Sequence, residues 1–177
     1  MRLHRFYIKQ TIPQVGEFVI SDENLLNQWR NVLRMDAGDQ LIMFDGSGDE
    51  VFCEFASLEK RLATLKIVER KAGLKPTRDV TLFMALIKKD NLELVLEKAT
   101  ELGVTRIVPV ECARSEKKGI NVKKKKKILR EAAEQSGRVI LPVFDDMVRV
   151  QDIFKKYSQT IIVLEPHGET SAREYFT

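Results

Sequence analysis

Hydrophobic and polar residues alternate over short stretches in the first part of the chain, a pattern that predicts β-strands. One of these stretches ends in Asp45-Gly46-Ser47-Gly48, a strong turn signal. A single helix interrupts the set, because apolar residues from Leu25 to Leu33 recur at helical spacing after Ser21, the expected N-cap. The predicted strands are Glu17–Ile20, Gln40–Phe44, Glu50–Ala56 and Arg61–Val68. Several short strands with one helix indicate a small β-barrel.

The second part of the chain alternates apolar strands with amphipathic helices. Its predicted strands are Val80–Ile87, Arg106–Val110, Val139–Phe144 and Thr160–Leu164. Asp90 and Glu93 form a candidate capping box for the first helix, which Gly103 ends, and the other predicted helices are Lys123–Ser136 and Val150–Tyr157. Nearly continuous apolar strands separated by helices are typical of a parallel sheet covered by helices.

The segment Lys71–Pro76 has no apolar periodicity and contains Gly73 and Pro76, as expected of an interdomain linker. We therefore predict two domains, a small β-barrel over residues 1–72 and an α/β domain over residues 73–177. A chain of 177 residues with 44% hydrophobic residues can bury a core for each, and its composition argues against disorder.

Several broad classes of protein do not fit the composition. The longest apolar runs are far shorter than the roughly 20 residues that span a bilayer, and the charged N-terminal sequence predicts no secretory signal. Cys53 and Cys112 are far apart, which indicates a reducing compartment, and we expect a cytoplasmic protein with no metal site. No dinucleotide fingerprint, P-loop or G-x-S-x-G motif is present, and with only two histidines a hydrolase triad is unsupported.

Positive charge is concentrated in one segment. The net charge is only +4, but seven lysines and no acidic residue lie between Lys117 and Lys127. Such a cluster indicates a polyanionic partner, while a solvated start of a helix is the alternative. If the partner is RNA, neutralising Lys123–Lys127 is expected to weaken binding and to flatten its salt dependence.

Polar residues also follow two predicted elements of the α/β domain. Arg114 lies after the second strand, and ligands bind at the carboxyl ends of strands in parallel sheets. Gln135, Ser136 and Arg138 lie around the glycine that ends the second helix, where a guanidinium could hold a phosphate or a base edge. Arg138 could alternatively pair with Glu134, four residues earlier.

Short motifs spread over most of the chain resemble one known family. They are His4-Arg5-Phe6-Tyr7, Val32-Leu33-Arg34-Met35 with Gly38-Asp39, Phe44-Asp45-Gly46, Lys98–Val104 with Pro109, Arg114-Ser115, and Glu131–Arg138 with Pro142. In this order they are similar to the bacterial small-subunit ribosomal RNA uridine-N3 methyltransferases of the SPOUT class.

The resemblance implies a fold, an activity and partners. The fold would be an N-terminal PUA-like barrel and a C-terminal α/β domain with a trefoil knot. The activity would be methylation of N3 of a uridine in 16S ribosomal RNA or the small ribosomal subunit, with S-adenosylmethionine as methyl donor and a homodimer as the assembly. A non-catalytic RNA-binding module of the same fold is the alternative, and calorimetric titration of S-adenosylmethionine separates the two.

The matching motifs and the lysine-rich segment together give the expected site residues. Arg138 is the expected catalytic residue, and its replacement by alanine is expected to lower turnover at least tenfold without loss of the fold. The expected contacts to RNA are Arg114, Gln135, Ser136, Lys123, Lys124, Lys125, Arg5 and Arg34, and those to the cofactor are Leu164, Glu165 and Pro166. No residue is identified as a general base.

The sequence departs from the family pattern in two places. Gln28 stands where a histidine is usual, so no role is assigned to it. Family members also continue beyond Leu164-Glu165-Pro166 with a Gly-Pro-Glu-Gly-Gly turn and a last strand and helix that close the cofactor pocket. We therefore expect these 177 residues alone to bind the cofactor weakly and not to methylate RNA.

Overall fold

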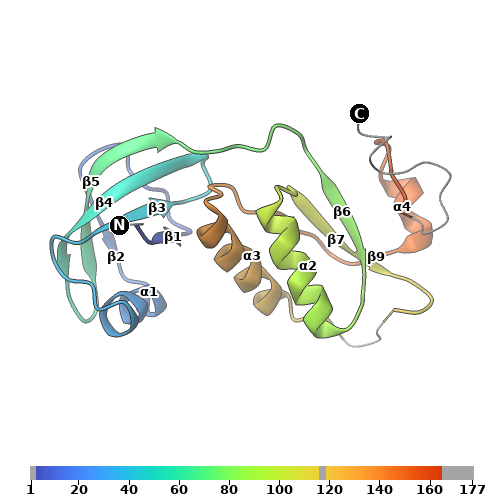
Figure 1. Cartoon of the computed structure of the whole chain (residues 1–177), viewed down its shortest axis with the longest axis horizontal. Helices are drawn as coiled ribbons and strands as arrows, with labels where there is room; N and C mark the ends of the chain where they lie inside the picture. Colours follow the sequence, from blue (N-terminus) through green and yellow to red (C-terminus); the bar gives the residue numbers. More distant parts are fainter. Residues whose placement is uncertain (1–2, 116–118, 165–177) are drawn as a thin grey trace.

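The computed structural model describes residues 3–115 and 119–164, which form two lobes (Figure 1). The N-terminal lobe is a β-sheet with one helical segment, and the second lobe is a small sheet flanked by helices. The alternation of strands and helices predicted from the sequence is therefore confirmed at the level of the two lobes.

The N-terminal lobe contains a five-stranded sheet in the order β1-β3-β4-β5-β2. Its strands are β1 (Arg5–Tyr7), β2 (Glu17–Ile20), β3 (Gln40–Phe44), β4 (Asp49–Leu58) and β5 (Ala63–Ala72). Strand β1 runs parallel to β3, and the other pairings are antiparallel. The edge strands β1 and β2 are not paired with each other in the described chain, so the predicted barrel is not closed by a continuous ladder.

An aromatic core fills this lobe. The Trp29 ring is fully buried and makes edge-on contacts with Phe6 and Phe55, with ring centroids 5.5 and 5.1 Å apart. Trp29 is carried by the π-helix η1 (Gln28–Val32), which directly continues helix α1 (Glu23–Asn27). These large rings pack with buried aliphatic side chains such as Ile12, Leu41 and Leu65, and burial of this cluster stabilises the lobe.

The helix of this lobe differs from its prediction in two ways. Asp22, not Ser21, is the N-cap, since its carboxylate accepts hydrogen bonds from the backbone N–H groups of Asn24 and Leu25 at 2.9 and 3.2 Å. Val32 was expected on the inner face but is 67% exposed. The π-turn explains this, because its wider backbone hydrogen bonds rotate the last residues away from the α-helical register.

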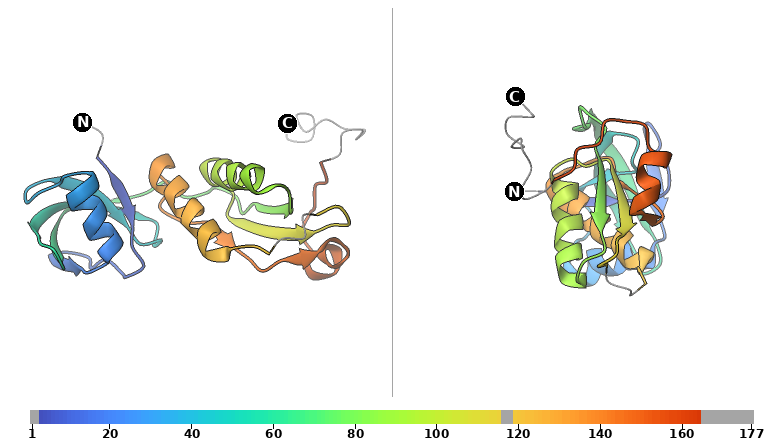
Figure 2. Two further views of the ribbon diagram at one scale, coloured as in Figure 1. Left: turned by 90° about the horizontal axis from the view of Figure 1, so that it is seen from below. Right: turned by 90° about the vertical axis from the view of Figure 1, so that its right-hand side faces the viewer.

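The second lobe contains a parallel sheet with the strand order β6-β7-β8, in which β9 also pairs with β7. These strands are β6 (Thr81–Ala85), β7 (Arg106–Glu111), β8 (Val143–Phe144) and β9 (Val148–Arg149). Its helices are α2 (Lys89–Glu101), α3 (Val122–Ser136) and α4 (Val150–Lys156). Helices α2 and α4 lie on opposite sides of β6 and β7, and α3 packs against α2 (Figure 2). The predicted parallel sheet with helices on it is thus confirmed.

Three strand predictions for this lobe were wrong in detail. Strand β6 is half-exposed along its whole length, not buried, because β7 is its only neighbour in the described sheet. Residues 160–164 form no strand, and of Val139–Phe144 only the last two residues pair. Val139 is instead fully buried between the lobes.

The predicted capping box at the start of α2 is also absent. The helix begins after Lys88, which makes no side-chain cap, and Asp90 lies within its first turn. Glu93 pairs with Lys124 and Lys125 of α3, with its Oε1 atom 2.8 and 3.0 Å from their Nζ atoms. The glutamate therefore joins two helices and does not close its own first turn.

The two lobes contact each other through β1 and the C-terminal half of α3. The backbone N–H of Tyr7 donates to Glu134 Oε1 at 3.0 Å, and Arg5 Nη2 donates to the Gly137 carbonyl at 3.1 Å. Phe44, Ala133 and Val139 form a buried cluster beneath these bonds. The two lobes are therefore packed together. The segment predicted as a linker, Lys71–Pro76, begins inside β5, because this strand extends to Ala72.

Candidate functional site

A pocket of about 520 Å³ lies at the carboxyl edge of the parallel sheet. Its walls come from the residues that follow β6 and β7 and from the β9–α4 junction: Leu86, Glu111, Cys112, Ala113, Ser115, Gly119, Ile120, Met147, Arg149, Val150 and Gln151. Parallel strands end at one edge of a sheet, so these connections converge there, as ligand-binding loops do in α/β folds. The pocket combines aliphatic side chains with a carboxylate, a guanidinium and an amide, a mixture that suits a nucleoside.

The turn after β7 is fixed by its own hydrogen bonds. Ser115 Oγ accepts from the Cys112 N–H at 2.8 Å, and the Ser115 N–H donates to the Cys112 carbonyl at 3.0 Å. Arg114 lies within this turn and is exposed. Its neighbours Ala113 and Ser115 line the carboxyl-edge pocket, so Arg114 lies beside that pocket, and its contact with RNA stays a prediction.

Arg138 lies at the opposite edge of the sheet, because the helices run back from the carboxyl edge. Its Nη1 atom donates to the carbonyls of Thr100 and Val104 at 2.8 and 2.7 Å, so the guanidinium caps the C-terminus of α2. The side chain is buried, and this burial lowers the pKa of Arg138. The structure therefore does not bring Arg138 and Arg114 together.

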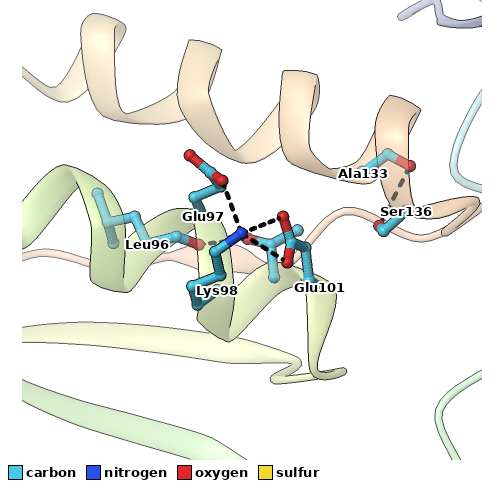
Figure 3. Close-up of polar contacts among 7 residues, drawn as sticks. Leu96, Glu97, Lys98, Glu101, Ala133 and Ser136 are labelled. Carbon is cyan, nitrogen blue, oxygen red and sulfur yellow. Dashed lines mark hydrogen bonds and ion pairs between the residues drawn. The ribbon is translucent and has the colours of Figure 1, made fainter.

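Gln135 and Ser136 are exposed on the last turn of α3. Ser136 Oγ lies 3.5 Å from the Ala133 carbonyl, one turn earlier on the same helix (Figure 3). On the neighbouring helix α2, Lys98 pairs with Glu97 and Glu101 at 2.9 and 3.0 Å.

The pairing with Glu134 considered for Arg138 is not seen, since Glu134 accepts from Tyr7 and its carboxylate is 3.9 Å from Arg130. Burial raises the pKa of Glu134.

A larger cleft of about 930 Å³ lies between the two lobes. The N-terminal lobe contributes residues from the end of β1 and from the β2–α1 junction, including Lys9, Asp22 and Asn24. The other wall is the face of α3 that carries four cations at helical spacing: Lys123, Lys126, Lys127 and Arg130. We call this space the interdomain cleft.

The lysine-rich segment is thus divided between two faces of α3. Lys124 and Lys125 face α2, and Lys125 is buried there. Hydrogen bonds from Lys124 and Lys125 lower the pKa of Glu93 to about 2, so this carboxylate is ionised at neutral pH. Of the lysines expected to contact RNA, Lys123 alone lines the cleft, while Lys117 and Lys118 lie outside the described residues.

The two arginines expected to bind RNA are placed differently. Arg5 is engaged at the contact between the lobes, since its Nη2 atom is 2.6 Å from Glu50 Oε1 and also donates to Gly137. Arg34 is exposed after η1 and has a left-handed φ of 55°. Neither lines the interdomain cleft.

Leu164, the first of the three residues expected to contact the cofactor, is exposed, and Glu165 and Pro166 lie outside the described residues. Within the described part of the chain no group of His, Cys, Asp and Glu side chains could hold a metal ion. No described helix is long and apolar enough to span a membrane.

Sequence reasoning missed Lys9, Arg130 and most of the carboxyl-edge pocket. The spacing of Lys123, Lys126, Lys127 and Arg130 was a usable signal, because i, i+3, i+4 and i+7 positions share one helical face. No comparable signal marked Met147 or Arg149, which reach the pocket only through the pairing of β9 with β7.

Comparison with known proteins agrees with this two-lobed arrangement. Residues 74–177 match the RNA methyltransferase domain, and residues 30–68 match the RNA methyltransferase PUA domain. Ribosomal RNA small subunit methyltransferase E from Bacillus subtilis is 32% identical, over 96% of this chain and 72% of that protein. The protein of the same name from Rickettsia conorii is 26% identical, over 94% of this chain and 68% of its own length.

Solved structures of methyltransferases are also similar to this chain. The ribosomal RNA small subunit methyltransferase E of Neisseria gonorrhoeae, bound to S-adenosylmethionine, superposes with a TM-score of 0.78 at 26% identity, covering 89% of this chain and 66% of that one. A Legionella pneumophila protein, solved with bound cofactor, shares the fold with a TM-score of 0.87 at 23% identity, over 99% of this chain and 75% of that one. This chain therefore belongs to the RNA methyltransferase family that includes ribosomal RNA small subunit methyltransferase E.

Proposed function

We propose that this chain transfers a methyl group from S-adenosylmethionine to N3 of a uridine in 16S ribosomal RNA. The match of residues 74–177 to the RNA methyltransferase domain carries this proposal. The names of the Bacillus and Rickettsia relatives support a small-subunit ribosomal RNA substrate, and the Neisseria relative supports the cofactor. The resemblance found in the sequence motifs supplies the uridine N3 position.

Bound S-adenosylmethionine supplies a methyl group whose bond to sulfur breaks as the bond to N3 forms, while the N3 proton leaves to solvent. The protein must hold the two reactants in line, and such positioning accounts for several kcal/mol of rate enhancement. It must also receive an unpaired base, because N3 lies on the pairing edge of uridine.

The carboxyl-edge pocket is our candidate for the place where the reactants meet. Leu86, Met147 and Val150 offer apolar contacts to a base, and Glu111 and Arg149 offer polar contacts to a ribose. Arg114 lies beside the pocket and is proposed to contact RNA. Leu164, with Glu165 and Pro166, remains the proposed contact to the cofactor.

Arg138, with Gln135 and Ser136 beside it, is proposed to stabilise the charge on the uridine. Because Arg138 lies at the edge of the sheet opposite the carboxyl-edge pocket of its own chain, this role requires that it act on the pocket of a second copy in the proposed homodimer. The hydrogen bonds of Arg138 to Thr100 and Val104 offer a structural alternative. Two domains divided near residue 72, the trefoil knot, a homodimer and a cytoplasmic location belong to the same proposal.

The experiment uses small-subunit RNA, S-adenosylmethionine with a tritiated methyl group, and the purified chain. Methylation at N3 blocks Watson–Crick pairing, so reverse transcription of the product should stop at one nucleotide. Incorporation of label without such a stop would contradict the N3 assignment but would still support methyl transfer to RNA. Absence of label, with RNA binding retained, is the outcome that the expected weak cofactor binding of these 177 residues predicts, and it would favour the non-catalytic RNA-binding module that the cations of the interdomain cleft also suit. Label together with the stop would show that this expectation is wrong and that the 177 residues are active.

A further inference from the structure

The interdomain cleft contains cations that no residue of the described chain neutralises. Five cations line it, and the one carboxylate among its walls is Asp22, which is engaged as the N-cap of α1. Lys127 and Arg130 have carboxylate partners on their own helix, at 3.6 and 3.9 Å. Within the described residues, Lys9, Lys123 and Lys126 have no ion pair. An anionic ligand would therefore meet free ammonium groups here.

Lys9 lies on the wall of the cleft opposite Lys123 and Lys126. Lys123 and Lys126 lie about one turn apart on α3, and the cationic row down to Arg130 extends about 10 Å along the helix axis. Lys9 lies on the other wall, just past the end of β1. The remaining polar groups of that wall include the side chains of Gln10, Ser21 and Asn24.

The two walls therefore differ in chemistry. The α3 wall offers a row of positive charge, as a phosphodiester backbone requires. The wall of the N-terminal lobe combines apolar side chains with the amide and hydroxyl groups of Gln10, Ser21 and Asn24, which can donate to and accept from base edges. A single nucleic-acid strand fits this asymmetry, because its phosphates can face the α3 wall while its base edges face the wall of the N-terminal lobe.

The size of the cleft restricts the form of that partner. A volume of about 930 Å³ lies at the upper end of the range for enclosed small-molecule sites, about 300–1,000 Å³. A paired RNA duplex has two strands and turns its base edges inward, away from the polar groups of the cleft walls. The cleft can thus take a few nucleotides of one strand.

We propose that the interdomain cleft holds an unpaired RNA strand, with its phosphates on Lys123 and Lys126 of α3 and with Lys9 gripping it from the opposite wall. This inference rests on the proposed function and adds the form of the substrate: a single strand that passes between the two lobes. Base edges then face Gln10, Ser21 and Asn24.

The test measures binding of a fluorescein-labelled oligouridylate of about ten nucleotides by anisotropy, at salt concentrations from about 50 to 200 mM. Each phosphate contact to a single strand contributes about 0.7 to the slope of log K against log salt. The full chain with Lys123→Gln and Lys126→Gln should therefore lose about 1.4 from this slope. Both lysines lack internal ion pairs, so the fold is expected to persist, and circular dichroism checks this.

The matched control carries Lys155→Gln and Lys156→Gln on α4, which removes the same charge from exposed helical positions outside the cleft. Its slope should stay unchanged. Adding Lys9→Gln to the cleft variant should lower the slope by about 0.7 more, whereas no further change would overturn the contact with the second wall.

Three outcomes would overturn the proposal: an unchanged slope in the cleft variant, an equal loss in the control, or equal binding of a fully paired duplex of the same length. The methyl-transfer assay on small-subunit RNA distinguishes this failure from failure of the proposed function. Methylation by the unaltered chain with no slope change in the cleft variant would remove the cleft assignment alone. A slope change without methylation would support RNA binding in the interdomain cleft and would contradict methyltransferase activity of this chain.

Discussion

At the scale of single residues, Arg138 shows how one side chain can satisfy two different interpretations. It was selected as a catalytic residue because it follows a helix stop in a motif of the family. In the structure its guanidinium donates to two carbonyls at the end of α2, across 38 and 34 residues of sequence. Helix C-termini leave several carbonyls without partners, so a buried donor there stabilises the fold directly.

We expect Arg138→Ala to lower the free energy of unfolding by about 2–3 kcal/mol, because the buried Thr100 carbonyl and the partly buried Val104 carbonyl lose a charged donor. Urea denaturation of the variant and the unaltered chain measures this change. Turnover is then compared at a low temperature where both proteins are folded. A stability loss with normal turnover would assign Arg138 to structure alone, while a tenfold turnover loss in a folded variant supports the catalytic role.

At the scale of elements, the contact of α2 with α3 depends on Glu93. This carboxylate binds Lys124 and Lys125, and the latter has its ammonium group buried between the helices. A buried ammonium group without a carboxylate is costly, so the pair fixes how α3 is rotated. That rotation in turn directs Lys123 and Lys126 into the interdomain cleft.

Replacement of Glu93 by Gln should lower the Tm by several degrees at neutral pH. The pKa of Glu93 falls from 4.5 to about 2 in the folded protein, so its stabilising contribution is complete above pH 4.5 and is lost as the pH falls toward 2. The Tm difference between the two proteins should therefore shrink between about pH 7 and about pH 3. Glu97→Gln is the control, because Glu97 lies on the same helix and its ion pair, with Lys98, is at the surface. A pH-independent difference for Glu93→Gln would contradict the assignment.

At the scale of the whole molecule, the two lobes are held by a small interface that tolerates little extra volume. Gly73 lies directly against Val139, which is fully buried with Phe44 and Ala133. A Cβ atom at position 73 would lie 2.7 Å from Cγ2 of Val139 and closer still to Cγ1. Neither side can move freely, because Val139 is enclosed by both lobes.

Gly73→Ala is therefore expected to destabilise the chain by about 1–3 kcal/mol and to loosen the packing of the lobes. Urea denaturation gives the first quantity, and small-angle scattering detects the second as a larger radius of gyration. Gly119→Ala is the control, since a Cβ there meets nothing within 4 Å. An equal free energy of unfolding for the two variants would show that the interface between the lobes accommodates the added methyl group without loss of stability.

Local pattern was sufficient for most elements. Alternation predicted β2 and β3 with the bounds that the structure has, and apolar spacing predicted α3 and α4 to within one residue at each end. These patterns are readable because neighbouring residues face the same or opposite sides of one element. The family motifs were equally local, and the matched domains agree with them.

Tertiary structure decided what the same residues do. Whether a lysine of α3 faces Glu93 or the interdomain cleft depends on how α3 packs on α2, and the half-exposure of β6 depends on which strands pair with it. Arg138 and Thr100, or Tyr7 and Glu134, meet only after distant segments fold together. Sequence periodicity specifies the face that a residue occupies on its own element, but the partner on that face comes from another part of the chain, and only packing brings it there.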